Sequence, residues 1–300
     1  MKTPNSGDDQ RPHILDLTPA KLGSWLKDHG HPKFRLRQIL GWLFERRAES
    51  FDDMTDLPKA LRDELTTEFR LWTAEIHTHQ HADDGTEKLL LDLADGGRVE
   101  CVLLRDGNRR SICVSSQVGC AMGCVFCASG LDGVDRNLSR GEILEQMLRL
   151  QRLLPAPVRL SLIVLLGMGE PLANLDSVRA ALEVAKSADG LGIRPRRITI
   201  STVGLPAAID RLARYSTPFH LAISLHAPND ELRDRLVPVN SKIGIREILM
   251  AADRYFHATG RRLTFEYVLL AGINDSEACA HQLVRLLKGR VSMLNVIPYN

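Results

Sequence analysis

The spacing of apolar residues divides the 300-residue chain into four parts, three of which lie before residue 109. From residue 15 to about 69, apolar residues recur every three or four positions, which is the spacing of helices that pack by one face. Residues 73–105 alternate between apolar and polar instead, and Asp95-Gly96-Gly97 is typical of a hairpin turn. These patterns predict three segments: a disordered polar tail over 1–12, a helical domain over 13–72 and a β element over 73–108.

Beyond residue 108, short β-rich runs alternate with amphipathic helical stretches. The runs lie at 111–116, 160–166, 197–201, 220–226, 262–270 and 291–297. Strand–helix units in tandem favour parallel strands with right-handed crossovers. Because no dinucleotide-type glycine fingerprint occurs among them, we expect a six-unit partial TIM-like (βα)6 barrel over 109–300 rather than a doubly wound sheet. The predicted fold class is α/β, with a small helical domain in front of the barrel.

The composition narrows the class of protein without identifying a substrate. Apolar residues make up 44% of the chain and charged residues 25%, as in ordinary globular proteins. The longest apolar run, at 160–169, is about half of the ~20 residues that a membrane-spanning helix needs, and no apolar targeting segment begins the chain. We therefore expect a cytoplasmic protein with no membrane partner. A net charge of +2 neither requires nor excludes a nucleic-acid partner.

Three of the six cysteines stand close together in "CAMGCVFC", directly after the first barrel strand. They are Cys120, Cys124 and Cys127, a C-x3-C-x2-C spacing. A structural zinc site needs four ligands, and the candidates for a fourth are Cys101, Cys113, His81 and His226. Iron–sulfur clusters usually have four thiolates, so three leave one iron of a 4Fe-4S cluster open to a small molecule. The spacing favours a cluster that takes part in chemistry, with zinc as the alternative.

Polar and glycine-rich segments follow the other barrel strands. They are "GMGEP" at 167–171, "STVG" at 201–204, "SLHAPN" at 224–229 and "IPYN" at 297–300. In a barrel of parallel strands the carboxyl ends share one rim, where active sites gather. Each motif alone is better explained as an ordinary loop, but together with the cysteines they predict one site at that rim.

The cysteine motif on the first βα loop resembles that of the radical S-adenosylmethionine superfamily. Together with "GMGEPLAN", "RRITISTVG", "AISLHAPND", "NVIPYN" and "KFRLRQILGWLF", it makes nearly all of residues 15–300 resemble the RlmN/Cfr family of RNA adenine methyltransferases. The resemblance implies methylation of C2 of an adenine in 23S rRNA and of an adenine next to the tRNA anticodon. It also implies one 4Fe-4S cluster and S-adenosyl-L-methionine as cofactors, a flavodoxin or ferredoxin as electron donor, and a monomer.

The resemblance assigns cofactor roles to side chains at the strand ends. Cys120, Cys124 and Cys127 would hold the cluster. The cofactor would be bound by Gly169, Glu170, Ser201, Ser224, His226 and Asn300. The first two would bind its amino end, and the last would close the site. Taken alone, the glutamate could cap a helix, the serines could satisfy loop backbone, and the histidine could be a structural hydrogen bonder.

Two further residues match catalytic positions of the family. Glu100, in "RVECV", matches the acceptor of the ring-carbon proton; taken alone it could be a surface carboxylate on an edge strand. Cys113 matches the cysteine that resolves a covalent protein–RNA intermediate by forming a disulfide; taken alone it could be a small buried hydrophobe. Cys101 and Cys279 match nothing, and we expect them to pack.

The chain departs from the family pattern at its end. The family has a second reactive cysteine, the methyl carrier, beyond the "IPYN" strand, whereas no cysteine follows Cys279 here. We expect that a C-terminal segment is missing and that the sequence is part of a longer protein. The alternatives are a radical enzyme of this superfamily that lacks the carrier and does not methylate, a methyltransferase acting on adenine C8, and a noncatalytic RNA-binding protein with structural zinc.

RNA contact would rely on basic residues in both halves of the chain. In the helical domain they are Lys33, Arg35, Arg37, Arg46 and Arg47, and on the barrel side Arg105, Arg109, Arg110, Arg194, Arg196 and Arg197. These could contact phosphates if they share a face, and otherwise they form a solvated basic surface.

Overall fold

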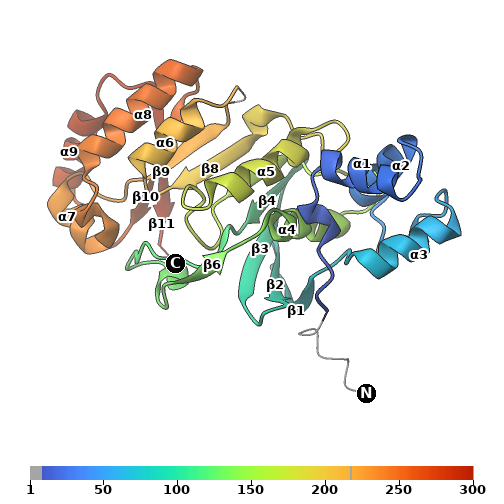
Figure 1. Ribbon diagram of the computed structural model, residues 1–300. Coiled ribbons are helices and arrows are strands. Elements are labelled where there is room, and N and C mark those ends of the chain that lie inside the picture. Colours follow the sequence, from blue (N-terminus) through green and yellow to red (C-terminus); the bar gives the residue numbers. More distant parts are fainter. Residues whose placement is uncertain (1–8, 217, 300) are drawn as a thin grey trace. The chain divides into compact units, whose positions relative to one another are not determined.

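A computed structural model describes residues 9–216 and 218–299, which fold into two compact units (Figure 1). The first unit consists of the chain up to Val114 together with Leu138–Leu162 and Asp176–Ile193. The second consists of Ser115–Asn137, Ile163–Leu175 and the chain from Arg194 onward. The two units interleave along the sequence, and the division into 13–72, 73–108 and 109–300 remains a prediction.

The first unit combines helices with an antiparallel sheet. Its helices are α1 (Pro19–Asp28), α2 (Phe34–Phe44), α3 (Lys59–Glu68), α4 (Arg140–Arg152) and most of α5 (Leu175–Lys186). Its strands are β1 (Ala74–His81), β2 (Glu87–Leu93), β3 (Arg98–Asp106) and β4 (Arg109–Val114), each antiparallel to the next. The predicted hairpin joins β2 to β3, where Gly97 N donates to Asp95 Oδ1 at 3.1 Å. The helical and hairpin patterns are therefore confirmed.

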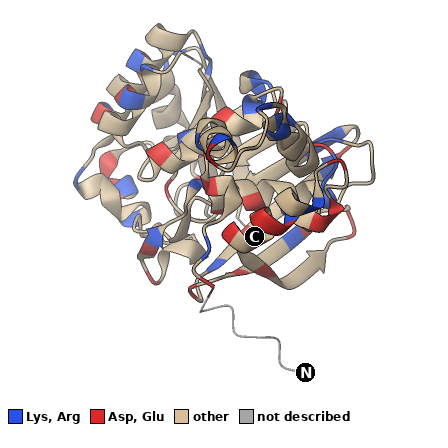
Figure 2. Ribbon diagram, turned by 45° about the vertical axis from the view of Figure 1, so that its right-hand side comes forward, with Lys and Arg blue, Asp and Glu red and all other residues tan. Residues whose placement is uncertain are grey.

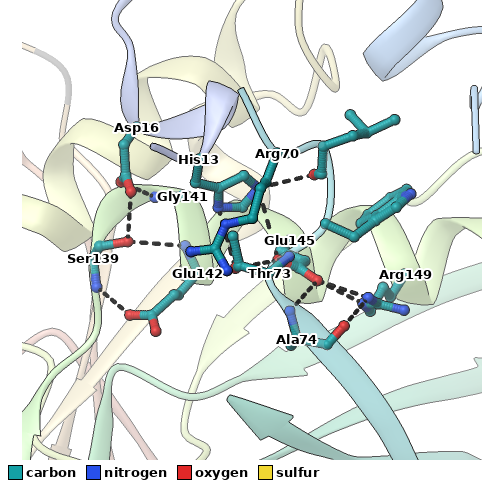
Figure 3. A network of polar contacts seen from close by, with 12 residues as sticks. His13, Asp16, Arg70, Thr73, Ala74, Ser139, Gly141, Glu142, Glu145 and Arg149 are labelled. Atoms are coloured by element: carbon teal, nitrogen blue, oxygen red, sulfur yellow. Dashed lines mark hydrogen bonds and ion pairs between the residues drawn. The ribbon is translucent and has the colours of Figure 1, made fainter. Parts of the chain in front are cut away.

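A network of polar contacts fixes the chain around α4 (Figure 3). Ser139 caps the helix in a capping box, since Ser139 N donates to Glu142 Oε2 at 2.8 Å and Glu142 N donates to Ser139 Oγ at 3.2 Å. Asp16 accepts from Gly141 N at 2.6 Å at the same helix end. One turn further, Glu145 is 1% exposed and binds the segment that leads into β1. The network ties the N-terminal residues of the unit to its central helix.

The second unit is built on a parallel sheet. Its strands β7 (Leu162–Leu165), β8 (Ile198–Thr202), β9 (His220–Ser224), β10 (Leu263–Leu269) and β11 (Ser292–Pro298) pair in this order. Its helices are α6 (Pro206–Ala213), α7 (Asp230–Leu236), α8 (Ile245–Thr259) and α9 (Glu277–Leu287), and β5 (Gln117–Gly119) pairs with β6 (Val134–Asn137). Figure 1 shows α6, α8 and α9 grouped beside the parallel strands. The strands lie where the sequence predicts them.

Burial separates the inner strands of this sheet from its edge. The middle residues of β9 are fully buried, whereas most residues of β11 are exposed, including Met293, Leu294 and Val296. Parallel order brings the carboxyl ends of all these strands to one side of the sheet. No helix within residues 9–216 or 218–299 is long and apolar enough to cross a membrane.

Candidate functional site

The cysteine loop lies between β5 and β6 and is held by backbone hydrogen bonds. Cys120 N donates to Gly133 O at 2.6 Å, and Val125 N donates to Leu236 O at 3.1 Å. Gly119, just before the loop, has a φ of +74°, and a Cβ there would lie 2.2 Å from Gly133 O. Only glycine fits at this turn, which fixes where the first cysteine projects.

The cysteine thiols are partly buried and close enough to influence one another. Burial raises the pKa of Cys120, and it raises the pKa of Cys124 to about 12, with the charges of Cys127 and Cys120 acting in the same direction. Thiolates at these positions therefore need a cation beside them. An iron–sulfur cluster supplies that positive charge and accepts thiolate ligands, so the donor set fits such a group.

The three cysteines line one cavity of about 210 Å³ within the second unit. Five other predicted site residues line the same cavity: Gly169, Glu170, Ser201, Ser224 and His226. Asn300, predicted to close the site, lies outside the described residues. The structure thus brings together side chains from the ends of successive parallel strands, as the sequence predicts for a barrel rim.

The "GMGEP" segment is fastened to the strand before the cysteine loop. Ser116 N donates to Met168 O at 2.8 Å, and Glu170 N donates to Gln117 Oε1 at 2.8 Å. Gly169 has a φ of +96°, and a Cβ there would lie 2.5 Å from the Cβ of Gln117. The close approach of the two segments therefore requires glycine at this position.

The carboxylate of Glu170 is buried without a positive partner. It accepts hydrogen bonds from Val203 N at 2.8 Å and Leu172 N at 2.9 Å and is 2% exposed. Burial raises its pKa to about 6, although these hydrogen bonds act in the opposite direction. Among the described residues no lysine or arginine pairs with it. A cationic ligand group in the cavity would therefore stabilise the ionised form of this carboxylate.

The two predicted serines, Ser201 and Ser224, differ in the hydrogen bonds that they form with their neighbours. Ser201 is 3% exposed, and its Oγ has no hydrogen-bond partner among the described residues. Buried hydroxyls nearly always find a partner, so an unmatched one lining a cavity suits a polar ligand. Ser224 also lines the cavity, and its carbonyl accepts from Arg233 Nη2 at 3.0 Å.

His226 is held rigidly at the end of β9 in the left-handed backbone region, with a φ of +58°. Its Nδ1 accepts from Val268 N at 3.1 Å, which leaves the proton of the neutral ring on Nε2. Burial and the charge of Arg233 lower its pKa to about 3. Phe126 of the cysteine loop packs edge-on against the ring at 4.7 Å. His226 is thus a neutral donor that also supports the cysteine loop.

Two buried charged residues at or beside the cavity were not predicted from the sequence. Arg233 is fully buried and donates to the carbonyls of Val203 (2.6 Å), Ser224 (3.0 Å) and Leu225 (3.1 Å), which follow β8 and end β9. Glu266 lines the cavity and accepts from Asn295 Nδ2 at 2.6 Å. Arg233 looked like one more surface charge of a short helix, and Glu266 like a polar residue within a strand, so neither gave a signal.

The two predicted catalytic residues belong to the first unit. Glu100 lies on β3, 44% of its side chain is exposed, and its Oε1 forms an ion pair with Lys88 Nζ at 2.9 Å. Cys113 lies on β4, opposite Val102 of β3. Among the described residues, which include all six cysteines, no disulfide bond is present. The disulfide that the resemblance assigns to Cys113 is therefore not seen.

Comparison with known proteins places this chain in a family. Residues 114–282 match the model of the radical SAM superfamily, and residues 13–71 match that of the ribosomal RNA large subunit methyltransferase N-terminal domain. The chain is 67% identical over 288 residues to a probable dual-specificity RNA methyltransferase RlmN of Rhodopirellula baltica, covering 96% of this chain and 78% of that protein. A protein of the same name from Symbiobacterium thermophilum is 46% identical over 97% of this chain and 78% of its own length.

A solved structure supports the same assignment. The crystal structure of a radical SAM methyltransferase from Sphaerobacter thermophilus superposes with a TM-score of 0.93 at 44% identity, covering 96% of this chain and 85% of that one. The predicted fold class, a radical SAM α/β fold with a helical N-terminal region, is confirmed by this match. The chain belongs to the radical SAM superfamily and, within it, to the RlmN family of RNA methyltransferases.

Proposed function

We propose that this protein methylates C2 of an adenine in 23S rRNA and of an adenine next to the tRNA anticodon, using S-adenosyl-L-methionine and a 4Fe-4S cluster. The observation that carries the proposal is the single cavity lined by Cys120, Cys124 and Cys127 and by the polar residues of the strand ends. The relatives' names, which specify a dual-specificity RNA methyltransferase, support the choice of RNA as substrate.

The cluster would be held by the three cysteine thiolates. When bound, it would supply the reducing electron, and so the radical chemistry, that a ring carbon without a lone pair requires. The chain's own residues bind and orient the sulfonium cofactor. Glu170 offers a buried carboxylate to the cofactor's ammonium group, and Gly169 lets the backbone approach closely.

The remaining polar residues would fix the rest of the cofactor. The Oγ of Ser201, unmatched among the described residues, suits a ribose hydroxyl. His226 presents an Nε2–H that can donate to an acceptor such as a carboxylate, and its low pKa keeps it neutral at physiological pH. Ser224 and Asn300 complete the proposed set. Positioning of this kind is what the protein contributes to cofactor chemistry.

Glu100 and Cys113 would act on the RNA. In its ion pair with Lys88, Glu100 is a carboxylate that can accept the proton lost from the adenine ring carbon. Cys113 would attack the sulfur of the family's methyl-carrying cysteine, which the resemblance places beyond the "IPYN" strand. A disulfide would form as the S–C bond to the RNA breaks, and the released carbon would take up a proton to become the methyl group. Flavodoxin or ferredoxin would provide the electron, and the protein would act as a monomer.

The alternative of a structural zinc fits the cysteines less well. A tetrahedral zinc with Zn–S bonds of about 2.3 Å would hold its sulfur ligands roughly 3.8 Å apart. Among the described residues, the groups of three His, Cys, Asp or Glu ligand atoms within 4.8 Å of one another do not include these three thiols. In a cluster each thiolate binds a different iron, so the three sulfurs do not have to meet at one ion.

The basic residues differ in how well they are placed to contact RNA. Figure 2 shows lysines and arginines interspersed with acidic residues in both units. Arg194, Arg196 and Arg197 are exposed but precede β8, whereas Ser201 lies near its carboxyl end. They therefore lie on the opposite side of the sheet from the site and are poorly placed to present a base to it. Arg46 forms an ion pair with Asp56 at 2.9 Å, so its charge is already partly compensated within the protein.

Anaerobic reconstitution with iron and sulfide tests the cofactor assignment. About four irons per chain and formation of 5′-deoxyadenosine from S-adenosylmethionine under reductant are expected. Cys124→Ala should abolish both, whereas Cys279→Ala, at a buried cysteine on α9 that does not line the cavity, should retain them. One zinc per chain in place of iron would overturn the proposal.

Mass spectrometry of RNA nucleosides tests the substrate. Incubation of protein that includes the family's methyl-carrying cysteine with unmodified 23S rRNA and tRNA should yield 2-methyladenosine from both. Glu100→Gln should retain 5′-deoxyadenosine formation but lose methylation, while Asp106→Asn, at the exposed end of the same strand, should keep both. Formation of 8-methyladenosine would shift the assignment to C8, and cofactor cleavage without RNA product would support a radical enzyme that does not methylate.

A further inference from the structure

Strand β1 in the first unit carries three histidines, and two of them face one buried glutamate of β2. The strand register places His81 opposite Glu87 and His79 opposite Leu89, two residues along β2. Residues opposite each other share a face of the sheet, as do residues two apart on one strand. His79, His81 and Glu87 therefore lie on one face of the β1–β2 hairpin. His77 lies at a register shift between Ile76 and Thr78 and contacts Asp92 instead, at 2.9 Å.

The three side chains converge on one carboxylate oxygen. His79 Nε2 lies 2.6 Å from Glu87 Oε2, and His81 Nδ1 lies 3.5 Å from the same atom. The centroids of the two imidazole rings are 4.1 Å apart. One ligand atom from each residue lies within 4.8 Å of the other two.

Glu87 can bind a metal ion through one carboxylate oxygen, Oε2. It is 7% exposed, and its Oε1 is occupied by an ion pair with Arg105 Nη2, which leaves Oε2 for the histidines. Burial acts to raise its pKa, but the hydrogen bonds and charges of Arg105 and His79 outweigh burial and lower it. A carboxylate oriented by a neighbouring hydrogen bond is the usual outer-shell arrangement of protein metal sites.

The distances suit a transition metal after a small adjustment. With bonds of about 2.1 Å to nitrogen and oxygen, a tetrahedral zinc ion sets its ligand atoms roughly 3.4 Å apart. The distance from His81 Nδ1 to Glu87 Oε2 already has nearly this value, at 3.5 Å. The hydrogen-bonded pair of His79 and Glu87, at 2.6 Å, has to open, and His79 stands on an edge strand where its ring can move. His81 is 64% exposed, so a fourth position faces water.

We propose that His79 Nε2, His81 Nδ1 and Glu87 Oε2 form a binding site for a divalent transition-metal ion, zinc in the first instance, with water in the fourth position. Two imidazoles and one carboxylate are a donor set that zinc accepts, and the remaining open position admits an exchangeable ligand. The ligands come from both strands and enclose the β1–β2 turn, so the ion also ties the hairpin together. This site uses nitrogen and oxygen donors and does not depend on the proposed methylation.

Zinc titration of the cluster-reconstituted chain tests the proposal. Bound zinc, iron and sulfide are measured after equilibrium dialysis in a zinc buffer. One zinc per chain is expected, with iron and sulfide unchanged. X-ray absorption at the zinc edge should show nitrogen and oxygen neighbours at about 2.0–2.2 Å and no sulfur shell at about 2.3 Å.

Variants of β1 provide the matched comparison. His81→Gln, an exposed change that leaves the Glu87–Arg105 pair in place, should weaken zinc binding by about 100-fold, since it removes one of three protein ligands. His79→Gln should do the same. His77→Gln, on the same strand but paired with Asp92, should bind like the parent chain.

Three results would overturn the proposal. The first is the absence of zinc on the reconstituted chain, and the second is a sulfur shell, which would place the ion on the cysteines. The third is an equal loss of affinity in His77→Gln and His81→Gln. Circular dichroism of each variant confirms that the fold is retained.

Discussion

Two buried glutamates, one in each unit, show how the same side chain serves different purposes. Glu145 on α4 is 1% exposed and receives a full set of donors: Thr73 N (2.9 Å), Thr73 Oγ1 (2.7 Å), Ala74 N (3.1 Å) and Arg149 Nε (2.9 Å). Arg149 also supplies the compensating charge, at 2.8 Å. Glu170 is 2% exposed and receives backbone donors, while none of the described lysines and arginines pairs with it.

The difference separates scaffold from site. A buried carboxylate with its own arginine completes the structure and gains nothing from a ligand. A buried carboxylate without a cation is harder to ionise, so its pKa is raised, to about 6 for Glu170. A bound cation would stabilise its ionised form. Both residues are ordinary glutamates in the sequence, so only their partners reveal the two roles.

The largest effect is expected from Glu145→Gln. The amide would turn an NH2 group toward either Thr73 or Arg149 and would leave the mostly buried guanidinium without its counter-charge. Breaking a buried ion pair in this way costs about 3–5 kcal/mol. Urea unfolding followed by circular dichroism measures the loss.

The matched control is Glu183→Gln on α5, whose side chain is 40% exposed and pairs with Lys186 at 2.8 Å. Its free energy of unfolding should change by less than about 0.5 kcal/mol. If both variants lost the same small amount, Glu145 would not be the scaffold carboxylate that its contacts indicate.

The next effect concerns the buried cation of the second unit. Arg233 binds carbonyls at the ends of β8 and β9 rather than Glu170. Arg233→Met would leave these carbonyls without donors and should cost roughly 2–4 kcal/mol. It should also reduce the iron bound on reconstitution, because the strand ends that carry Ser224 and Val203 would shift. Arg235→Met, an exposed position on the same helix, should change neither quantity. An unchanged stability in Arg233→Met would mean that the arginine is replaceable there.

Arg233 and Glu145 also show which features could not be predicted from the sequence. Strand and helix positions could be predicted because alternation and helical spacing are local properties of the chain. The cysteine loop and the rim residues could be found because their motifs follow the strands in order. Arg233 could not be found, since its burial depends on carbonyls supplied by two distant strands. Nothing within "NDELRDRL" distinguishes it from the exposed Arg235.

For Glu145 the sequence indicates an ion pair but not its burial. Its spacing to Arg149 is that of a helical ion pair, which usually lies on the surface. Its burial depends on Thr73 and Ala74, which no periodicity connects to α4. The metal donors of β1 were likewise noticed only in part, because the pairing of His79 and His81 with Glu87 requires the strand register. Contacts between segments far apart in sequence therefore determine most of what was missed.

A smaller effect, and one of a different kind, is expected from Glu170→Gln. Without cofactor two effects oppose each other at pH 7: a buried charge is removed, but the amide NH2 would face the backbone N–H of Leu172 or Val203. The net change in the free energy of unfolding should therefore be less than about 2 kcal/mol. The affinity of the reconstituted protein for S-adenosylmethionine should fall about 10- to 100-fold, because the ammonium loses its carboxylate. Anaerobic calorimetry measures the affinity. Glu266→Gln, a second carboxylate of the same cavity that accepts from Asn295, should change it less than about twofold. The reverse result would transfer the role to Glu266.

The smallest effect is the pH dependence that Glu170 contributes. Burial raises its pKa from 4.5 to about 6, so the folded protein holds this proton more tightly than the unfolded chain does. Without cofactor, stability is therefore lost as the pH rises from 4.5 to about 6, by roughly 2 kcal/mol. Cofactor binding has the opposite dependence, because the ammonium needs the ionised carboxylate. Lowering the pH from 7 to 5 should weaken binding about tenfold in the parent protein and leave Glu170→Gln unaffected. The same measurement in Glu145→Gln should retain the full tenfold change. A parent protein whose affinity stays level across this range would show that Glu170 does not pair with the cofactor's cation, and the contrast between the two glutamates would lose its functional half.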